Sequence, residues 1–494
     1  MGADRFRLLM LWGLGIVLAI VVPLLYRSTY CLAQSPDPFL YSQAAKEMLA
    51  GKRLYLECWQ DKPPLAIVAY ALPQILRPRS YSAIMFGLGL SLVGQGLLVG
   101  WALRSNVVVA LAAFLFIAFS PMTHWDFAWP STEHFSNFFI TANLVVAYVI
   151  CRDRRFSLVQ CLLWGAVSSA AFNTRQGTVF SAVVPLAALL MAEAPLRRKT
   201  LGIAAAGAGF LAAWLAVLGL VAWIGDLRGY YHTVFTYPRS YARLGDRGQV
   251  IELVRQLLCS TWLPVLATLF AGLSLRTRYR WLAMVALVSG FLLCLLPMRA
   301  FPHYWVNLLP AIALLVGLGL DACNRSLRGL EWIGLATVAI VVLPHADRHL
   351  RAAHAAQNYE AYVRVAAAAD RLAPAGATLL VNGPMTCEAI QFASRLPAAH
   401  MYSTAFQLGY PNCTILPRPI ERIVEEYLAS PPGVIVMPAV DLERLPQTAQ
   451  DPTAMRLIRL LWKRYTYRVA EVVEGYAIAV RTPPQLSPSP EASR

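Results

Sequence analysis

The chain has 494 residues, of which 57% are hydrophobic and only 14% are charged, whereas ordinary soluble domains carry about 25% charged residues. This balance excludes an intrinsically disordered protein and argues against a soluble enzyme. The net charge of +16 points to a nucleic acid, an anionic membrane or a phosphate-bearing ligand. The apolar segments favour the membrane, so no nucleic-acid partner is expected.

Long apolar runs dominate the first 345 residues. A helix needs about 20 apolar residues to cross a bilayer, because the hydrocarbon core is about 30 Å thick. Eleven segments are predicted to span the membrane: 8–25, 81–103, 106–121, 138–151, 157–173, 177–193, 201–224, 257–275, 281–298, 306–323 and 330–344. Basic residues follow the fourth, sixth, eighth and tenth of them on one side, which the positive-inside rule makes cytoplasmic. Residues 1–345 therefore read as a polytopic α-helical membrane module.

The first outer loop, 26–80, contains an amphipathic stretch at 39–50 that predicts a helix lying along the membrane interface. Asp37 precedes this stretch. A carboxylate at that position can act as a general base on a hydroxyl group, or it can simply cap the helix. Lys62, which precedes two prolines, is placed either to pair with a phosphate or to contact lipid headgroups.

Further charged residues lie in the other outer turns. Glu133 opens the fourth segment as a candidate functional acid or as a favourable first-turn acid. Arg175 and Arg299 place cations outside, against the positive-inside tendency. An anionic ligand would explain them, because a guanidinium fork matches phosphate oxygens; contact with lipid headgroups is the alternative. His303, four residues after Arg299, either belongs to the same anion site or makes a structural hydrogen bond.

The sequence does not favour a metal site. The second outer loop carries His124, Asp126, Glu133 and His134, but their spacing matches no metal-ligand motif. The nine cysteines form no CxxC pair. Two cysteine pairs share an outer segment and are candidate disulfides in an oxidising compartment: Cys31 with Cys58, and Cys387 with Cys413.

The end of the chain changes character. Residues 346–482 alternate helix-like and strand-like segments, which predicts a small α/β domain. Eleven spans would place this domain outside the cytoplasm. Residues 483–494 are rich in proline and serine and are predicted to be a disordered tail.

Taken together, these residues resemble the bacterial polytopic glycosyltransferases of the GT-C superfamily, of the protein-mannosyltransferase and aminoarabinose-transferase type (glycosyltransferase family 39). Five motifs in the same order carry the resemblance, across most of the chain. They are Asp37 with Tyr41 and Ala44–Ala45; Gly51 with Tyr55 and Lys62-Pro63-Pro64; Thr132-Glu133; Arg175-Gln176; and His303-Tyr304 ahead of Leu308-Leu309-Pro310. One departure is Pro38, where many relatives have a second acid, and this puts a paired-acid or metal-binding role in doubt.

The resemblance implies an inner-membrane enzyme that moves a sugar from a polyprenyl-phosphate donor to a hydroxyl group of a glycolipid, polysaccharide or protein. Asp37 would be the general base, and the sugar would be transferred with inversion. Lys62, Arg175, Arg299, His303 and Tyr304 would hold the donor phosphate, and Tyr41, Tyr55 and Glu133 would bind substrate. No cofactor is required, and nothing in the sequence supports a divalent cation. A lipid-linked sugar transporter or flippase, or a non-catalytic envelope scaffold, is the alternative.

Overall fold

The computed structural model of the chain divides into two compact units, which are described separately. The first unit comprises Met1–Ala33 and Gln60–Ala356, and the second comprises Gln34–Trp59 and Gln357–Arg494. The structure describes residues 3–29, 36–58, 60–103, 106–124, 128–243, 247–260, 263–274, 277, 279–299, 301–326, 329–355, 358–382, 393, 420–443 and 453–482.

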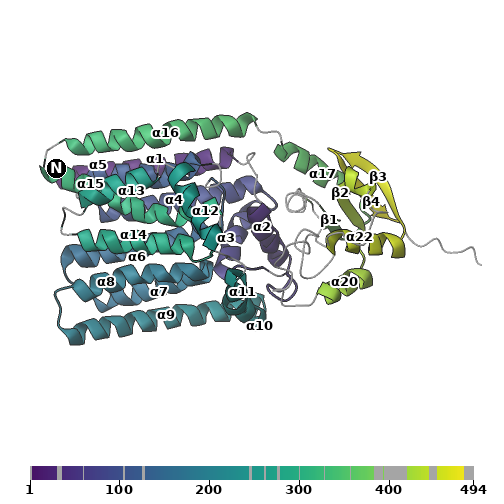
Figure 1. Cartoon of the computed structure of the whole chain (residues 1–494), viewed down its shortest axis with the longest axis horizontal. Coiled ribbons are helices and arrows are strands. Elements are labelled where there is room, and N and C mark those ends of the chain that lie inside the picture. Colours follow the sequence, from purple (N-terminus) through teal and green to yellow (C-terminus); the bar gives the residue numbers. More distant parts are fainter. Residues whose placement is uncertain are drawn as a thin grey trace, which may run out of the picture. The chain divides into compact units, whose positions relative to one another are not determined.

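The first unit is a bundle of roughly parallel helices (Figure 1). Its longer helices are α1 (Ala3–Ser28), α3 (Pro64–Leu76), α4 (Tyr81–Ala102), α5 (Val107–Phe119), α6 (Thr132–Asp153), α7 (Leu158–Thr174), α8 (Val183–Met191), α9 (Leu196–Ile224), α12 (Arg247–Ser260), α13 (Leu263–Ser274), α14 (Arg280–Leu295), α15 (Leu309–Ser326) and α16 (Leu330–Ala355). Shorter turns are the 3-10 helices η2 (Ser120–Thr123), η3 (Gln176–Ala182) and η5 (Pro302–Leu308), the π-helix η4 (His232–Thr236), and α10 (Leu227–Tyr231) and α11 (Tyr237–Arg243).

Each of the eleven segments expected to cross the membrane overlaps one or two helices of this bundle. Among the described residues, four helical segments are long and apolar enough to cross by themselves: Tyr81–Ala102, Thr132–Asp153, Leu196–Ile224 and Pro302–Ala322. The sequence reading did not anticipate α3. This apolar helix has only 13 residues and contains Pro73, so it is too short to be recognised as a span.

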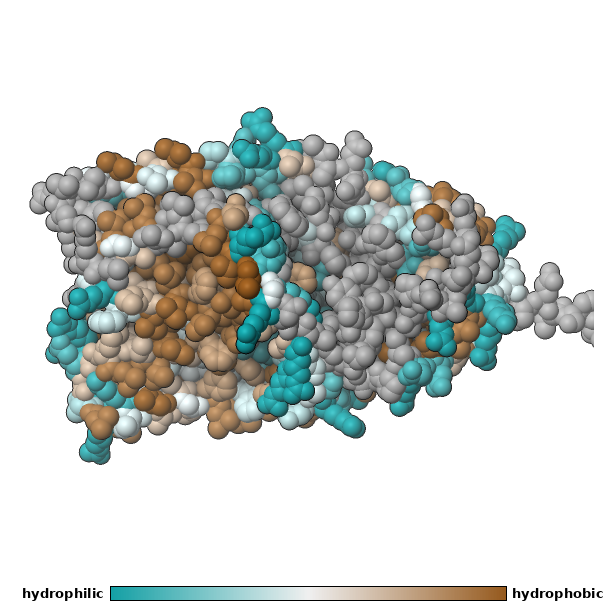
Figure 2. Space-filling view, viewed as in Figure 1, coloured by the Kyte–Doolittle hydropathy of each residue, from teal (hydrophilic) through white to brown (hydrophobic). Residues whose placement is uncertain are grey.

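The bundle presents a hydrophobic side surface. Figure 2 shows a largely brown band over the helices, with hydrophilic side chains near the helix ends. Only 22% of the most apolar part of α9 is buried, against 89% for Pro302–Ala322. The α9 helix therefore lies at the periphery of the bundle and Pro302–Ala322 in its centre. An exposed, apolar periphery is expected of helices in contact with lipid.

The α7 and α9 helices approach each other unusually closely. A Cβ atom added to Gly165 would overlap the carbonyl oxygen of Ala206, and one added to Gly209 would overlap that of Leu162. Small residues at such positions let two helix backbones come into direct contact, which is the common packing mode of membrane helices. These two glycines therefore set the distance between α7 and α9.

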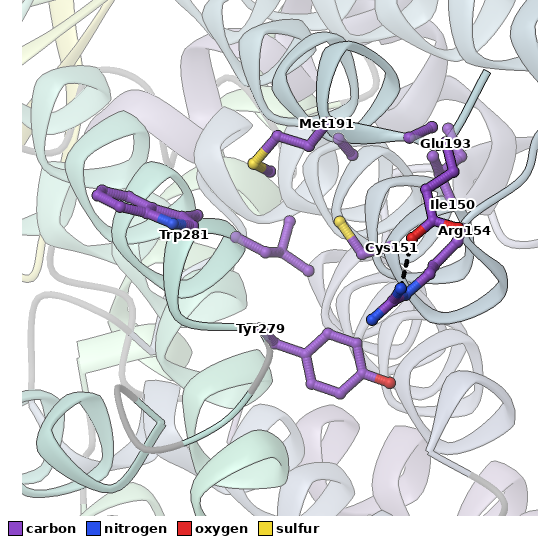
Figure 3. Close-up of a pocket in the computed structure, with 10 residues that line it drawn as sticks. Ile150, Cys151, Arg154, Met191, Glu193, Tyr279 and Trp281 are labelled. Atoms are coloured by element: carbon purple, nitrogen blue, oxygen red, sulfur yellow. Dashed lines mark hydrogen bonds and ion pairs between the residues drawn. The ribbon is translucent and has the colours of Figure 1, made fainter.

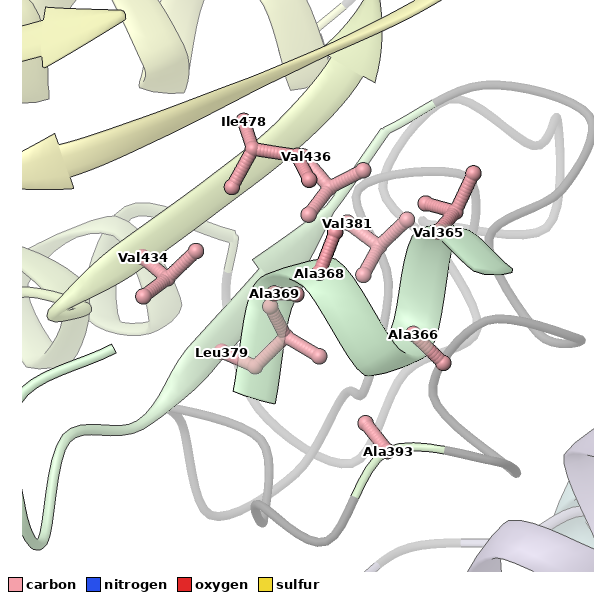
Figure 4. Packing of buried hydrophobic residues seen from close by; sticks show 10 residues of the cluster. All are labelled: Val365, Ala366, Ala368, Ala369, Leu379, Val381, Ala393, Val434, Val436 and Ile478. Carbon is pink, nitrogen blue, oxygen red and sulfur yellow. The ribbon is translucent and has the colours of Figure 1, made fainter. Parts of the chain in front are cut away.

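The second unit contains a four-stranded sheet, made of β1 (Leu379–Val381), β2 (Val434–Pro438), β3 (Tyr467–Val473) and β4 (Tyr476–Arg481) in the order β1-β2-β4-β3. The β1–β2 pair is parallel, with Leu380 opposite Ile435, and the other two pairs are antiparallel. Its helices are α2 (Pro36–Leu49), α17 (Asn358–Leu372), α20 (Ile420–Ala429), α21 (Ala439–Glu443) and α22 (Thr453–Arg464). Buried alanines of α17 pack against valines and Leu379 of the sheet (Figure 4).

The first loop and the C-terminal part of the chain belong to the same unit. The Nζ atom of Lys46, on α2, donates a hydrogen bond of 2.7 Å to the carbonyl oxygen of Ala393. Most of α2 is buried, including the polar side chains of Gln43 and Glu47. The helix expected over 39–50 corresponds to α2, and its location at the membrane interface stays a prediction.

Cys58, one half of the expected Cys31–Cys58 disulfide, is a buried thiol in the structure, and the pairing itself stays a prediction. Burial raises the pKa of this thiol above its ordinary value, as expected for a thiolate removed from water. Its suggested partner Cys31, the Cys387–Cys413 pair and the tail at 483–494 lie outside the described residues.

Candidate functional site

A buried ion pair joins the start of α6 to the end of α7. An Nη atom of Arg175 lies 2.9 Å from Oε1 of Glu133, and the two side chains are only 11% and 4% exposed. Glu133 sits in the first turn of α6, where its charge also suits the helix dipole. The hydroxyl group of Thr132 donates a 3.2 Å hydrogen bond to the other carboxylate oxygen. Both charges are thus held at one end of the bundle.

Aromatic side chains of η5 surround the pair. The guanidinium of Arg175 lies over the ring of Tyr304, 4.8 Å from its centre, which is a favourable cation–π distance. The Nε2 atom of His303 lies 3.9 Å from Oε1 of Glu133, and its ring stacks on Phe301. Buried Asn137, one turn along α6 from Glu133, fixes η5 by donating a 2.8 Å hydrogen bond to the carbonyl oxygen of Val306.

Lys62 contributes a further positive charge. Its ammonium group forms a 2.7 Å ion pair with Asp61, and it acts electrostatically on the Glu133 carboxylate together with Arg175 and His303. Four of the predicted site residues are therefore brought together: Lys62, Arg175 and His303 around the acid Glu133. Arg299 lies in the turn between α14 and η5, half-buried and four residues before His303.

The π-helix η4 connects the segments that carry Lys62 and Arg175. The hydroxyl group of Thr233 donates a 3.1 Å hydrogen bond to the carbonyl oxygen of Gln60, and its own carbonyl oxygen accepts 3.2 Å from Gln176. Gln60 lies two residues before Lys62, and Gln176 directly follows Arg175. The sequence reading missed Thr233 and Asp61, because a threonine or an aspartate in a polar loop follows no recognisable pattern. The only sequence signal for either residue was its position in a long basic loop on the predicted outer side of the membrane.

An apolar groove opens beside α3 in the same unit. It has a volume of about 620 Å³ and is lined by the second half of α3, the first half of α4, Phe135 of α6 and two cations, Arg27 and Arg77. The α3 helix begins two residues after Lys62 and ends in this groove. Its 13 residues correspond to about 18 Å at 1.5 Å per residue.

The remaining predicted residues, Asp37, Tyr41 and Tyr55, belong to the second unit. Asp37 is in the first turn of α2 and is half-buried. Tyr41 and Tyr55 are buried. Tyr55 has a φ of 68°, a left-handed conformation that costs a non-glycine residue about 1–2 kcal/mol. Such strain is concentrated at functional sites. The grouping of these three residues with the cations stays part of the proposal below.

Within the described residues, no group of three or more histidine, cysteine, aspartate and glutamate side chains could hold a metal ion. Glu133 and His134 are both buried, and Asp126 lies outside the described part of the chain.

The fold matches a known membrane-protein architecture. ArnT from Cupriavidus metallidurans, bound to undecaprenyl phosphate, superposes with a TM-score of 0.67 at 14% sequence identity, over 99% of this chain and 100% of that one. The chain shares the fold of this ArnT. The apo form of the same ArnT gives a TM-score of 0.62 at 14% identity, over 97% and 98% of the two chains. No protein-family model matches the sequence, and neither does any curated protein. At this identity the GT-C likeness is one of fold.

Proposed function

We propose that this GT-C chain is a glycosyltransferase that moves a sugar from a polyprenyl-phosphate donor to a hydroxyl acceptor. The observation that carries the proposal is the Glu133–Arg175 pair, buried at one end of the bundle with His303 and Lys62 around it. Burying charged groups is costly, so this arrangement calls for a functional reason. The two cations, Lys62 and Arg175, are paired with the acids Asp61 and Glu133. Their N–H donors and the His303 imidazole are gathered at one place, which suits an anion such as a lipid-linked phosphate.

The geometry of Arg175 favours phosphate binding. A guanidinium carries five N–H donors in a planar fork. Glu133 takes one edge and the Tyr304 ring covers one face. Glu133 therefore acts as a positioning residue that orients Arg175, and the other N–H groups can reach a phosphate. Lys62, Arg299 and Tyr304 would complete the phosphate site.

The apolar groove supports a lipid-linked donor. A polyprenyl tail lying along α3 would extend from a phosphate near Lys62 into the groove next to Leu72 and Phe86. The tail would then pack against apolar side chains, and this burial would stabilise binding by about 25 cal/mol per Å² of apolar surface removed from water. The relative with the same fold is bound to undecaprenyl phosphate, which is a ligand of this chemistry.

Asp37 is proposed as the base. Its carboxylate would remove the proton of the acceptor hydroxyl as that oxygen attacks the anomeric carbon. The bond from this carbon to the phosphate oxygen would break, and the phosphate would leave with the electron pair. Cations held in a site that excludes water stabilise such developing negative charge. Tyr41 and Tyr55 would bind the sugar or acceptor.

The proposed setting is the bacterial inner membrane, with the sheet-containing unit on the extracytoplasmic side. The acceptor would be a glycolipid, a polysaccharide or a protein. The carrier phosphate already activates the sugar, so the proposed reaction needs no nucleotide or other cofactor.

The Asp37→Asn variant tests this function against the alternative of a lipid-linked sugar flippase or scaffold. In proteoliposomes of the full chain, the variant should bind undecaprenyl phosphate as the wild type does but lose sugar transfer by at least about 100-fold. The matched control is Asp347→Asn, which changes an exposed aspartate paired with Arg351 and should keep both lipid binding and sugar transfer. Full transfer by Asp37→Asn would overturn the assignment of the base. An absence of transfer by the wild type, together with lipid movement across the bilayer, would establish the flippase.

A further inference from the structure

A second cavity lies at the end of α6 remote from Glu133. It has a volume of about 280 Å³ and is lined by residues of α6, α8 and α14 and the turns beside them (Figure 3). Glu133 is in the first turn of α6, and Cys151, in the cavity wall, is in its last turn. At 1.5 Å per residue these two positions are about 27 Å apart. The cavity therefore cannot be part of the site proposed for sugar transfer.

The lining is amphipathic. Ile150, Met191 and Leu282 contribute carbon surface, whereas Arg154 and Glu193 contribute charge. Figure 3 shows Arg154 and Glu193 joined on one side of the cavity, with the Trp281 ring on the other. A ligand that fits this lining has an anionic or polar head and an apolar chain.

Arg154 adopts a backbone conformation that is unfavourable for an arginine. It caps the end of α6 in the left-handed conformation, with φ of 52°. Glycine or asparagine is usual at this position, and an arginine there costs about 1 kcal/mol relative to glycine. Its carbonyl oxygen accepts a 3.2 Å hydrogen bond from the backbone N–H of Glu193, while its guanidinium pairs with the Glu193 carboxylate. Both side chains are more than half exposed.

The surrounding charge favours an anion. The segments 152–155 and 193–199, together with Arg280, carry seven basic and two acidic side chains. Arg280 lies over the ring of Trp281, which is 53% exposed. An exposed tryptophan beside basic residues at the ends of membrane helices marks the level of the lipid headgroups. The mouth of the cavity therefore lies where phospholipid phosphates are found.

We propose that this cavity binds an anionic membrane phospholipid. The phosphate diester replaces Glu193 as the partner of the Arg154 guanidinium, and the start of one acyl chain packs against Met191 and Leu282. The volume is close to the lower limit of about 300 Å³ for ligand pockets, which suits a headgroup and a few methylene groups. Basic pockets between membrane helices commonly bind lipids of this kind.

The test uses the purified full chain, with phosphatidylglycerol and phosphatidylcholine vesicles as probes and native mass spectrometry as the readout. Arg154→Gly removes the cation and also relieves the left-handed strain, so the variant should fold. It should weaken the binding of phosphatidylglycerol about tenfold and leave that of phosphatidylcholine unchanged. The matched control is Arg155→Gly, which removes the same charge one residue away, outside the cavity wall, and should change binding less than about twofold.

Glu193→Gln supplies a change in the opposite direction. Releasing Arg154 from its ion pair should strengthen the binding of phosphatidylglycerol several-fold. Equal losses in Arg154→Gly and Arg155→Gly would overturn the proposal, because they would indicate diffuse surface charge. Competition by inorganic phosphate at the same concentration as the lipid would overturn it too, because the chain would then bind the free ion. A cooperative melting transition in detergent like that of the wild type shows that each variant has kept its fold.

Discussion

The ion pair between Glu133 and Arg175 is the clearest feature of the proposed site at the scale of single residues. A buried ion pair contributes little to stability, because the desolvation of two charges offsets their attraction. Its value lies in geometry: the guanidinium is fixed by a carboxylate on one edge and by the Tyr304 ring on one face. Such a pre-oriented cation is suited to recognising a phosphate.

Arg175→Lys should therefore weaken the binding of undecaprenyl phosphate about tenfold, a loss of about 1.4 kcal/mol. Lysine keeps the charge but has neither the planar fork nor the stacking surface. Titration of the lipid into the purified variant measures the effect. Arg255→Lys, which changes an exposed arginine paired with Glu252, is the control and should bind normally. Equal affinity in Arg175→Lys and wild type would contradict the role of the fork.

The buried Glu47 carboxyl gives a prediction about pH. Burial raises the pKa of Glu47 above its ordinary value, although the Lys52 ammonium at 2.9 Å acts in the opposite direction. The folded chain thus retains this proton to a higher pH than the unfolded chain. The contribution of Glu47 to the unfolding free energy is therefore fully present below the ordinary pKa of a glutamate and falls as the pH rises through the raised pKa.

The melting midpoint of the wild type should fall as the pH rises above about 4. This fall should be smaller in Glu47→Gln, because glutamine does not ionise. Thermal unfolding of the purified chain across this range measures it. Glu57→Gln, a change at a less buried acid of the same segment, should keep the wild-type profile. If the melting midpoints of Glu47→Gln and the wild type changed identically with pH, the prediction would be contradicted, because the ionisation of Glu47 would then not affect stability.

Sequence reasoning found the charged members of the site for a physical reason. Arg175 and Lys62 stood out because cations on the outer side of a membrane need an explanation. Thr233 gave no such signal, since its contribution is two hydrogen bonds with partners more than 50 residues away. Contacts of that kind appear only once the chain has folded.

At the scale of elements, the π-helix η4 is hydrogen-bonded to the two segments that carry Lys62 and Arg175. Such turns are rare and are often found at functional sites. The hydrogen bonds of Thr233 to Gln60 and from Gln176 fix the chain next to Lys62 and Arg175. Thr233 is therefore a positioning residue.

Thr233→Val, which keeps the shape but loses the hydroxyl donor, should raise the KM for the lipid-linked donor several-fold while changing kcat by less than about twofold. Thr233→Ser should restore the wild-type KM, because serine keeps the donor. The control is Thr236→Val in the same π-helix, where the side chain is exposed. A fall of kcat and thermal stability in both valine variants, without rescue by serine, would indicate a merely structural role.

The α7–α9 contact gives the sharpest prediction about packing. Gly209→Ala should lower the stability of the bundle by about 1–3 kcal/mol, because the new methyl group would overlap the backbone of Leu162. Gly207→Ala, in the same helix but with no atom within 4 Å of the added carbon, should be neutral or slightly stabilising. Melting in detergent compares the two. Equal effects would contradict the close approach of α7 and α9.

Elements with strong periodicity or length could be anticipated, and the others could not. Apolar runs such as that of α9 are visible because lipid demands continuous hydrophobicity. The α3 helix was missed because it is short and contains Pro73. The β3 strand was missed because only Tyr465 and Thr466 separate it from α22, which leaves no clear turn signal. The turn between β3 and β4 consists of Glu474 and Gly475, which both have positive φ.

At the scale of the whole molecule, the fold is shared with ArnT, although the sequence is only 14% identical to it. Such a likeness fixes the helical architecture but leaves the chemistry to the residues at the site. The account of function therefore depends on one claim: that the chain consumes a polyprenyl-phosphate-linked sugar and delivers it to an envelope hydroxyl group.

Comparison of envelope glycoconjugates and the lipid-linked sugar pool by mass spectrometry, in cells with and without the chain, tests this claim most directly. Without the chain, we expect one glycoconjugate to lose the mass of a single type of sugar and the matching polyprenyl-phosphate sugar to accumulate. Wild-type protein should reverse both changes, and Asp37→Asn should reverse neither. Identical glycoconjugate masses and an unchanged lipid-linked pool in the two strains would contradict the account.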